Sequence, residues 1–178
     1  MVTLTTARLL LRNFRISDWE ALHATIAQYE ASGLAVYDQP WPTSPEKIKE
    51  ITAWFAGGDS YLAVCLPEND RWIGLVALSP ETNTGTVTFN LGYIFDFRYH
   101  GQGYATEACR AALEYAFTDL HAQRIITGTA AANQASCRLL ARLGFQKIAE
   151  RTGSFRNAPD GTPIEFLGYT FALTREQW

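Results

Sequence analysis

Residues 98–108 read RYHGQGYATEA and join the end of a strand-forming stretch to the start of a helix-forming one. Gly101 and Gly103 are separated by one residue, and glycine lets a backbone turn sharply with its N–H groups exposed. The free N–H groups and the positive dipole end of a helix favour bound anions. The segment therefore predicts an anion site in which the amides of residues 101–105 form the cradle and Arg98 adds positive charge.

Two common phosphate-binding loops do not match this segment. A dinucleotide-binding loop requires a third glycine three residues after the second, and that position is Thr106. A Walker A loop requires Gly-Lys followed by Ser or Thr, and the chain has no lysine between Lys49 and Lys147. The anion site therefore belongs to another class of loop.

The rest of the chain predicts a mixed sheet with helices around it. Residues 6–14 read as a first strand, and residues 17–20 have the spacing of a capping box that begins a helix. Ser44 followed by Pro45 predicts a second helix, which ends at Gly57. The later predicted elements are strands at 61–66, 72–78 and 86–95, a helix at about 103–118, a strand at 125–127, a helix at about 134–143, and strands at about 145–155 and 164–173. This order predicts an α/β (α+β) fold with a central mixed, mostly antiparallel sheet, in a single domain over residues 1–178.

The composition excludes several classes of protein. Of the 178 residues, 47% are apolar and 19% are charged, which is typical of a globular chain rather than a disordered or fibrous one. The net charge of −3 argues against nucleic acid or an anionic membrane as partner. The longest aliphatic run, residues 9–11, is too short to span a membrane. Three widely spaced cysteines show no metal-ligand pattern, so we expect a cytoplasmic protein without a metal.

The charges are unevenly distributed along the chain. Residues 1–97 carry six basic and eleven acidic side chains, a net charge of −5. Residues 98–151 carry seven basic and four acidic side chains, a net charge of +3, and they include the predicted anion site. The positive stretch within an acidic chain is consistent with local binding of an anion.

The pattern Arg98-x-x-Gly101-x-Gly103 resembles the acetyl-CoA loop of the GNAT N-acetyltransferases, whose motif is Arg/Gln-x-x-Gly-x-Gly/Ala. Three further segments resemble the RimJ/RimL branch of that family, which modifies the N-termini of ribosomal proteins. They are Arg8–Arg12, the segment Asn133–Phe145 with its Asn133-x-x-Ser136, and Tyr169–Trp178. The resemblance covers nearly the whole chain. It implies the GNAT fold, acetyl-CoA as co-substrate, an amine acceptor, and a monomer or homodimer.

The resemblance also implies which residues contact acetyl-CoA. Where the strand containing Gly92 separates from its parallel neighbour, backbone groups of the next three residues would pair with the pantetheine arm. Ser136 would donate a proton to the leaving thiolate, and a backbone N–H near Ile94 would hold the oxyanion. The implied contacts are Tyr93, Ile94, Phe95, Arg98, Gly101, Gln102, Gly103, Tyr104, Ala105, Asn133 and Ser136. Considered alone, Asn133 and Ser136 are also typical of a helix start, and Gly92 of close packing.

The general base is the point at which the chain departs from its relatives. Many members of the family carry Glu two residues before the Gly-Tyr pair, and this chain has Asn90, which cannot accept a proton. The base is then a water held by backbone carbonyls, or an acid or imidazole elsewhere, with Glu165 preferred over Asp38, Glu30 and His23 because relatives often place an acid on that strand. Asn90, Asp38 and Trp41 are the predicted acceptor-binding residues.

These observations predict direct transfer of an acetyl group from acetyl-CoA to a primary amine. The leading acceptor is the α-amino group of a protein or peptide, because about a tenth of such groups are neutral at pH 7, whereas well under a thousandth of lysine-like amines are. Acetylation of a small molecule (an antibiotic, a polyamine or an amino acid) is the alternative in the same fold. A catalytically idle CoA-binding module is the alternative that Asn90 leaves open.

Overall fold

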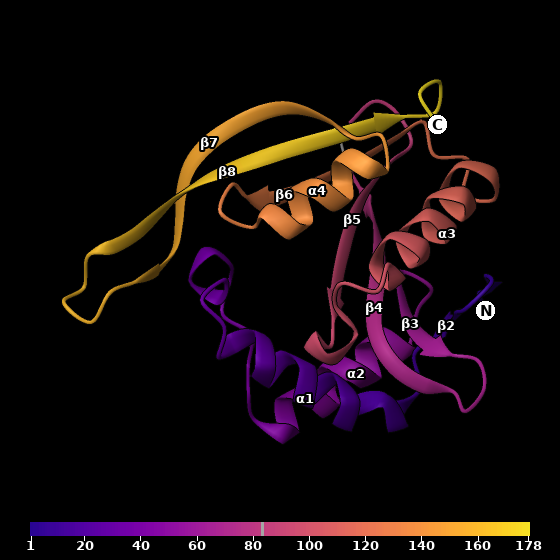
Figure 1. Ribbon diagram of the computed structural model, residues 1–178, viewed down its shortest axis with the longest axis horizontal. Coiled ribbons are helices and arrows are strands. Elements are labelled where there is room, and N and C mark those ends of the chain that lie inside the picture. The colour runs from indigo at the N-terminus through magenta and orange to yellow at the C-terminus, as the bar shows by residue number, and fades with distance from the viewer. Residues whose placement is uncertain (83) are drawn as a thin grey trace.

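The computed structural model describes residues 1–82 and 84–178. Within these residues the chain forms one eight-stranded sheet, four α-helices and three short 3-10 helices (Figure 1). In chain order the elements are β1 (Thr3–Thr5), β2 (Leu10–Asn13), η1 (Ile16–Asp18), α1 (Trp19–Glu30), η2 (Ala35–Tyr37), α2 (Pro45–Ala56), β3 (Tyr61–Leu66), β4 (Arg71–Glu81), β5 (Thr88–Phe95), η3 (Phe97–Tyr99), α3 (Tyr104–Thr118), β6 (Arg124–Ala130), α4 (Gln134–Arg142), β7 (Gln146–Asn157) and β8 (Pro163–Thr174).

The sheet is mixed and mostly antiparallel, as the sequence predicts. Its strand order is β1-β2-β3-β4-β5-β6-β8-β7. The pair β5–β6 is parallel, and the six other neighbouring pairs are antiparallel. The parallel pair is joined through α3, which is the crossover that a parallel connection requires. β5 and β6 are therefore central strands that form the one parallel pair of the described sheet.

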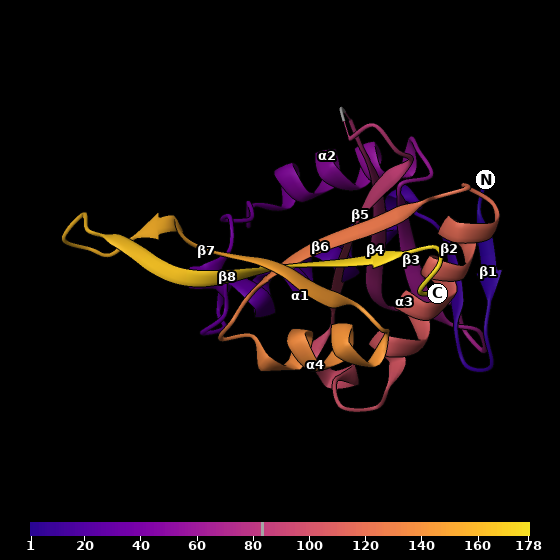
Figure 2. The same cartoon turned by 90° about the horizontal axis from the view of Figure 1, so that it is seen from above.

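Helices cover both faces of the sheet (Figure 2). α3 and α4 pack on one face through a core cluster that includes Leu91 and Phe95 of β5. α1 and α2 pack on the other face through a second cluster, against which Ile94 packs. Because side chains alternate along a strand, the odd-numbered side chains of β5 face α3 and α4, and the even-numbered ones face α1 and α2.

The N-terminal segment differs from the sequence prediction in two ways. The predicted single strand over residues 6–14 is a hairpin, because β1 ends at Thr5 and β2 begins at Leu10. The predicted capping box at residues 17–20 is also wrong. Asp18 is the N-cap of α1 and makes no side-chain cap bond. Its carboxylate instead accepts hydrogen bonds from the guanidinium of Arg12 at 2.8 and 2.9 Å and from the backbone N–H of Arg15, the N-cap of η1, at 2.7 Å.

The second predicted helix start is confirmed. The side chain of Ser44 accepts a hydrogen bond from the backbone N–H of Lys47, Pro45 occupies the first helical position, and Gly57 is the C-cap of α2. These residues work at the ends of α2 because they satisfy backbone groups that a helix leaves unpaired. The segment between α1 and α2, residues 31–44, is thereby fixed at both ends.

β7 and β8 form a long hairpin that extends beyond the rest of the sheet (Figure 1). The part nearer the sheet pairs with β6, from Arg124 opposite Thr174 to Ala130 opposite Gly168. The outer part lies next to the segment between α1 and α2, where the rings of Tyr37 and Phe166 lie 5.8 Å apart. Two segments more than 100 residues apart in sequence therefore approach each other on one side of the sheet.

Candidate active site

β5 and β6 pair over a short length and then separate. Three residue pairs join them, from Thr88 opposite Arg124 to Asn90 opposite Ile126. Beyond these pairs, residues 91–95 and 127–130 have no strand pairing with each other in the described part of the chain. The hydroxyl of Thr127 donates a 2.8 Å hydrogen bond to the carbonyl of Leu91 where the separation begins. We call the space between these two segments the β5–β6 gap; it lies where the resemblance predicted it.

The direction of the backbone groups of β5 decides which residues face this gap. The amide of Asp96 bonds the carbonyl of Ile73 on β4, and the carbonyl of Leu91 accepts from Thr127 on β6. Backbone groups alternate along a strand, and the register between β4 and β5 runs without a shift. Ile94 therefore directs its N–H and C=O toward β4, and Tyr93 directs its own into the gap. The N–H that faces the gap is therefore that of Tyr93, whereas the resemblance implied an oxyanion donor near Ile94.

Phe95 also differs from its predicted role. Its carbonyl accepts a hydrogen bond from Nε2 of His100 at 2.9 Å. The predicted pairing of a pantetheine arm with this carbonyl therefore competes with an existing contact. In β5, Tyr93 remains the residue with both backbone groups turned into the gap and unpaired among the described residues.

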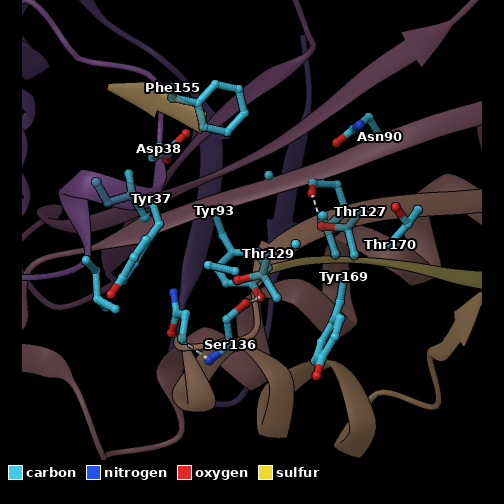
Figure 3. A pocket seen from close by; sticks show the side chains of 18 of the residues that line it. Tyr37, Asp38, Asn90, Tyr93, Thr127, Thr129, Ser136, Phe155, Tyr169 and Thr170 are labelled. Carbon is cyan, nitrogen blue, oxygen red and sulfur yellow. Dashed lines mark hydrogen bonds between the residues drawn. The ribbon is translucent and has the colours of Figure 1, made fainter. Parts of the chain in front are cut away.

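A pocket of about 750 Å³ passes through the gap and reaches both faces of the sheet (Figure 3). On the α1/α2 face it is lined by Asn90 and Ile94, and on the α3/α4 face by Tyr93 and Ser136. Seven of the predicted site residues line it, namely Asp38, Trp41, Asn90, Tyr93, Ile94, Asn133 and Ser136. A pocket open on both faces allows two reactants to enter from opposite sides and meet in the gap.

Hydrogen bonds hold Ser136 on the α3/α4 side of the gap. The side chain of Asn133 caps α4 by accepting from the amide of Ser136 at 3.1 Å, so the helix-start interpretation of Asn133 holds. The Oγ of Ser136 lies 2.6 Å from the hydroxyl of Tyr93, and Figure 3 shows the two side chains pointing toward each other. Burial raises the pKa of Tyr93, so its hydroxyl stays protonated near neutral pH.

The side-chain role of Tyr93 was missed in the sequence analysis, which gave this residue a backbone role only. The alternation of β5 carried the signal, since Leu91 and Phe95 face α3 and α4 and Tyr93 lies between them at the same spacing. Its hydroxyl then reaches the first turn of α4. This contact joins the strand that lines the gap to the helix that carries Ser136.

The predicted anion loop, residues 101–105, lies outside the pocket at the start of α3. Gly101 and Gly103 have φ angles of +73° and +84°, which L-residues with side chains rarely adopt. The backbone N–H groups of residues 101–105 donate no hydrogen bond to any residue that the structure describes. The loop therefore presents a row of unpaired donors at the positive end of a helix.

Arg98 contributes less free charge to this loop than the sequence suggests. Its guanidinium pairs with the buried carboxylate of Asp96, with both Nε–Oδ distances at 3.0 Å. The pairing lowers the pKa of Asp96 below its usual range, so this carboxylate stays ionised and offsets the charge of Arg98. The Arg98 side chain is nonetheless 73% exposed, so part of its guanidinium remains accessible.

The acceptor side of the pocket is built from the segment between α1 and α2 and from β7 and β8. Asp38 accepts hydrogen bonds from the Tyr29 hydroxyl at 3.2 Å and from the amide of Gln39 at 2.7 Å. It is the one carboxylate among the described residues that line the pocket. Figure 3 shows Asp38 beside Phe155 and across the pocket from Asn90.

Three of the residues considered as a general base do not line the pocket. Glu165 is exposed, and its neighbour Phe166 lines the pocket, so alternation along β8 turns Glu165 to the opposite face. Nε2 of His23 lies 2.8 Å from the carbonyl of Thr43. Glu30 is engaged by Arg156. Asp38 is the one remaining acid of the set that the structure brings to the pocket.

Arg156 joins the two segments of the acceptor side and was not identified from the sequence. Its guanidinium donates to both oxygens of Glu30 at 2.8 Å and to the carbonyl of Asp38 at 2.9 Å. Glu30 also accepts from the amide of Trp41 at 3.0 Å. We call the contact of Arg156 with Glu30 the Arg156–Glu30 bridge; it fixes Asp38 and Trp41 against the hairpin.

Residues 1–82 and 84–178 contain no group of three or more His, Cys, Asp or Glu side chains placed to hold a metal ion. Within the same ranges, none of the helices combines the length and the apolar character needed to cross a bilayer.

Comparison with known proteins places these features in a family. Residues 8–146 match the family model described as "Acetyltransferase (GNAT) domain". The chain is 29% identical over 177 residues to the uncharacterized N-acetyltransferase YnaD of Bacillus subtilis strain 168, covering 98% of each chain. It is 30% identical over 158 residues to the [Ribosomal protein uS5]-alanine N-acetyltransferase of Escherichia coli K12, covering 82% of this chain and 79% of that one.

The fold is shared with solved structures as well. A spermidine N-acetyltransferase from Vibrio cholerae, solved in complex with CoA and spermine, superposes with a TM-score of 0.78 at 19% identity. The superposition covers 97% of this chain and 98% of that one. The sheet, the divided β5–β6 pair and the loop before α3 thus agree with the family model that spans most of the chain. The protein belongs to the GNAT family and is an acetyl-CoA-dependent N-acetyltransferase.

Proposed function

We propose that this protein acetylates the α-amino group of a protein or peptide N-terminus, as the RimJ/RimL branch does. The observation that carries the proposal is the absence of a carboxylate next to the gap within the described residues, where Asn90 lines the pocket and Asp38 lies across it. A site with a weak base favours an amine that is already partly neutral, and at pH 7 that is an α-amino group rather than a lysine-like one. The E. coli relative is named for acetylation of a ribosomal-protein alanine.

The chain's own residues fit acetyl-CoA at two places. The unpaired amides of residues 101–105 suit the pyrophosphate, because the glycines leave the approach to these N–H groups open. The backbone C=O of Tyr93 suits the pantetheine arm, which would fill the β5–β6 gap as an added strand. Bound there, acetyl-CoA supplies the thioester whose carbonyl carbon the amine attacks.

The reaction then uses four groups of this chain. The N–H of Tyr93 stabilises the oxyanion, and a donor of this kind lowers a barrier by about 3 kcal/mol. As the carbon–nitrogen bond forms and the carbon–sulfur bond breaks, the Ser136 hydroxyl donates its proton to the thiolate. The Tyr93 hydroxyl donates its hydrogen bond to the Oγ of Ser136, which leaves the Ser136 proton directed at the sulfur. The amine proton leaves to water, water returns a proton to the Oγ of Ser136, and Asn90 accepts a hydrogen bond from the entering amine.

Asp38 and Trp41 would bind the remainder of the acceptor on the α1/α2 face. Asp38 is the one carboxylate among the described lining residues and the cationic Arg151 also lines the pocket, whereas a polyamine calls for several carboxylates. This charge count favours a peptide over a polyamine.

The test compares acceptors while released thiol is followed with acetyl-CoA as donor. The panel contains peptides with a free N-terminal alanine or serine, the same peptides with a blocked N-terminus and an internal lysine, and spermidine. We expect turnover with the free N-termini alone, with a rate that rises with pH through about 8 as the α-amino group loses its proton.

Each other outcome contradicts part of the proposal. Faster turnover of spermidine or another small amine would show that the acceptor is a small molecule and not a peptide. Thermal stabilisation by CoA without turnover of any acceptor would indicate an idle binding module. A lack of thermal stabilisation by CoA would contradict the proposed binding of acetyl-CoA.

A further inference from the structure

A cluster of side chains lies against the anion loop from outside its motif. Arg8, in the turn between β1 and β2, donates from Nε to Glu107 at 2.7 Å and from Nη1 to the carbonyl of Gln102 at 3.1 Å. Its guanidinium carbon also lies 4.6 Å from the centroid of the Tyr104 ring. An N-terminal residue therefore contacts three residues at the start of α3.

Glu107 presents an electrostatic difficulty for an anion site. It lies in the first turn of α3, close to the amides that would hold phosphate, and an unpaired carboxylate there repels a phosphate. Burial alone would raise the pKa of Glu107, but hydrogen bonds from Thr6 and Arg8 outweigh burial and hold the pKa below its usual value. The carboxylate is therefore ionised, and the Arg8 guanidinium, at 2.6 Å, supplies the compensating charge.

The second contact of Arg8 sets the direction of a loop peptide. In a trans peptide the C=O of one residue and the N–H of the next point in opposite directions. Because Arg8 draws the carbonyl of Gln102 toward itself, the N–H of Gly103 points away from Arg8. Gly103, on one side of this peptide, has a positive φ and is conformationally permissive, so it does not fix the direction of the peptide alone.

We propose that Arg8 is a positioning residue for the anion loop, which neutralises Glu107 and turns the Gly103 amide toward the pyrophosphate of acetyl-CoA. The proposal rests on the placement of the pyrophosphate at residues 101–105. It assigns a function to the first arginine of the segment Arg8–Arg12, whose other arginine pairs with Asp18 and Asp70 far from the loop.

The test separates phosphate binding from the rest of the reaction by using two acetyl donors. Arg8→Gln should weaken CoA binding about tenfold in calorimetry at low salt, with a smaller effect at high salt, because surface charges are screened. With S-acetylpantetheine, which lacks the pyrophosphate, the kcat/KM of the variant should equal that of the wild type. Arg15→Gln is the matched control, since it removes another exposed arginine paired with a carboxylate.

Two further variants identify the cause. Arg8→Gln/Glu107→Gln should recover part of the lost affinity, because the uncompensated charge is gone. Arg8→Lys should retain more affinity than Arg8→Gln, because it keeps the charge and loses only the two-pronged contact.

Three results would overturn the proposal. Unchanged CoA affinity in Arg8→Gln would show that the loop needs no support from Arg8, while tight binding by the wild type would leave the proposed function intact. Equal losses with both donors would show that Arg8 supports the fold generally. If the wild type itself failed to bind CoA, the placement of the pyrophosphate would be wrong.

Discussion

The two faces of the sheet contribute to the site by different physical means. On the α3/α4 face, backbone groups predominate, namely the amides of residues 101–105 and the N–H and C=O of Tyr93. On the α1/α2 face, side chains of two distant segments predominate, with Arg156 of β7 bound to Glu30 at the end of α1. We place the co-substrate at the first face and the acceptor at the second.

This difference explains which parts of the site a sequence reveals. A site built from backbone groups needs residues that permit an unusual conformation. Two glycines separated by one residue are a local sequence signal for such a site. A side-chain site needs partners brought together by the fold, and Glu30 and Arg156 are 126 residues apart. The predictions below test whether the two faces act separately, from the largest effect to the smallest.

The largest effect is expected at Ser136. Ser136→Ala removes the proposed donor to the leaving thiolate and should lower kcat about a hundredfold, the lower end of the range for general acid catalysis. CoA affinity should stay within about twofold in calorimetry, since backbone groups supply that binding. Tyr93→Phe keeps the ring and removes the hydroxyl, so it should lower kcat by less, about tenfold. A normal kcat in Ser136→Ala would leave Ser136 with a structural role at the start of α4.

The next effect tests the backbone nature of the α3/α4 face. Gly103→Val places a branched side chain at a φ of +84°, where a Cβ would also lie 3.4 Å from Nη2 of Arg8. Strain of this kind costs about 2 kcal/mol, so CoA should bind about 30-fold more weakly. Gly161→Val is the matched control, because Gly161 has a φ of +86° and lies in the β7–β8 loop. An equal loss in both variants would indicate general destabilisation.

The third effect tests the α1/α2 face. Glu30→Gln removes one charge of the Arg156–Glu30 bridge and should raise the KM for the acceptor about tenfold while the Kd for CoA stays unchanged. Glu50→Gln, which removes the exposed partner of Lys47, should change neither constant. Steady-state kinetics with the acceptor varied, together with calorimetry of CoA, checks both. A parallel loss of CoA affinity would show that the two faces are coupled.

The smallest effect concerns pH. Hydrogen bonds from Arg156, more than any other cause, lower the pKa of Glu30. A lowered folded-state pKa means that the bridge stabilises the protein fully above the unfolded pKa, about 4.3, and that this stability is lost as the pH falls through the folded value. The free energy of unfolding of the wild type should exceed that of Glu30→Gln by about 1 kcal/mol at pH 7, and this difference should shrink below about pH 4. Thermal unfolding of both proteins at pH 7 and pH 3.5 measures this change.

The sequence predicted the fold well where the signal was local. The helix start at Ser44, the loop at residues 101–105 and the cap at Asn133 each depend on a few neighbouring residues, and each is present. The start of α1 was mispredicted because Asp18 bonds Arg12 across the fold and Ser17 makes no cap, so a tertiary ion pair overrode a local pattern. The hairpin at residues 3–13 was missed because its turn, with Thr6 bonded to Leu9, lacks Gly and Pro.

Within the site, the sequence identified residues more reliably than their roles. Asn90, Asp38 and Trp41 do line the pocket, although Asn90 lies on β5 and the other two lie on the segment between α1 and α2. Strand register decides whether Ile94 or Tyr93 turns its backbone groups into the gap. A one-residue shift of the register would reverse the answer, and no sequence motif specifies the register. Glu165 was preferred as the base because relatives often place an acid on that strand. The alternation of side chains along β8 turns it away from the pocket.

The separation of β5 from β6 also has a consequence for motion. Within the sheet, β1–β5 and β6–β8 are two groups of strands that three residue pairs and the bond from Thr127 to Leu91 join at one end. Beyond that end, side-chain contacts such as the Tyr93–Ser136 bond and the Arg156–Glu30 bridge connect them. A ligand strand inserted in the gap adds main-chain hydrogen bonds between the two halves and so stiffens the whole molecule. Amide hydrogen exchange should therefore slow on binding of CoA along β6 and β8 as well as at the site, since the halves then open together or not at all.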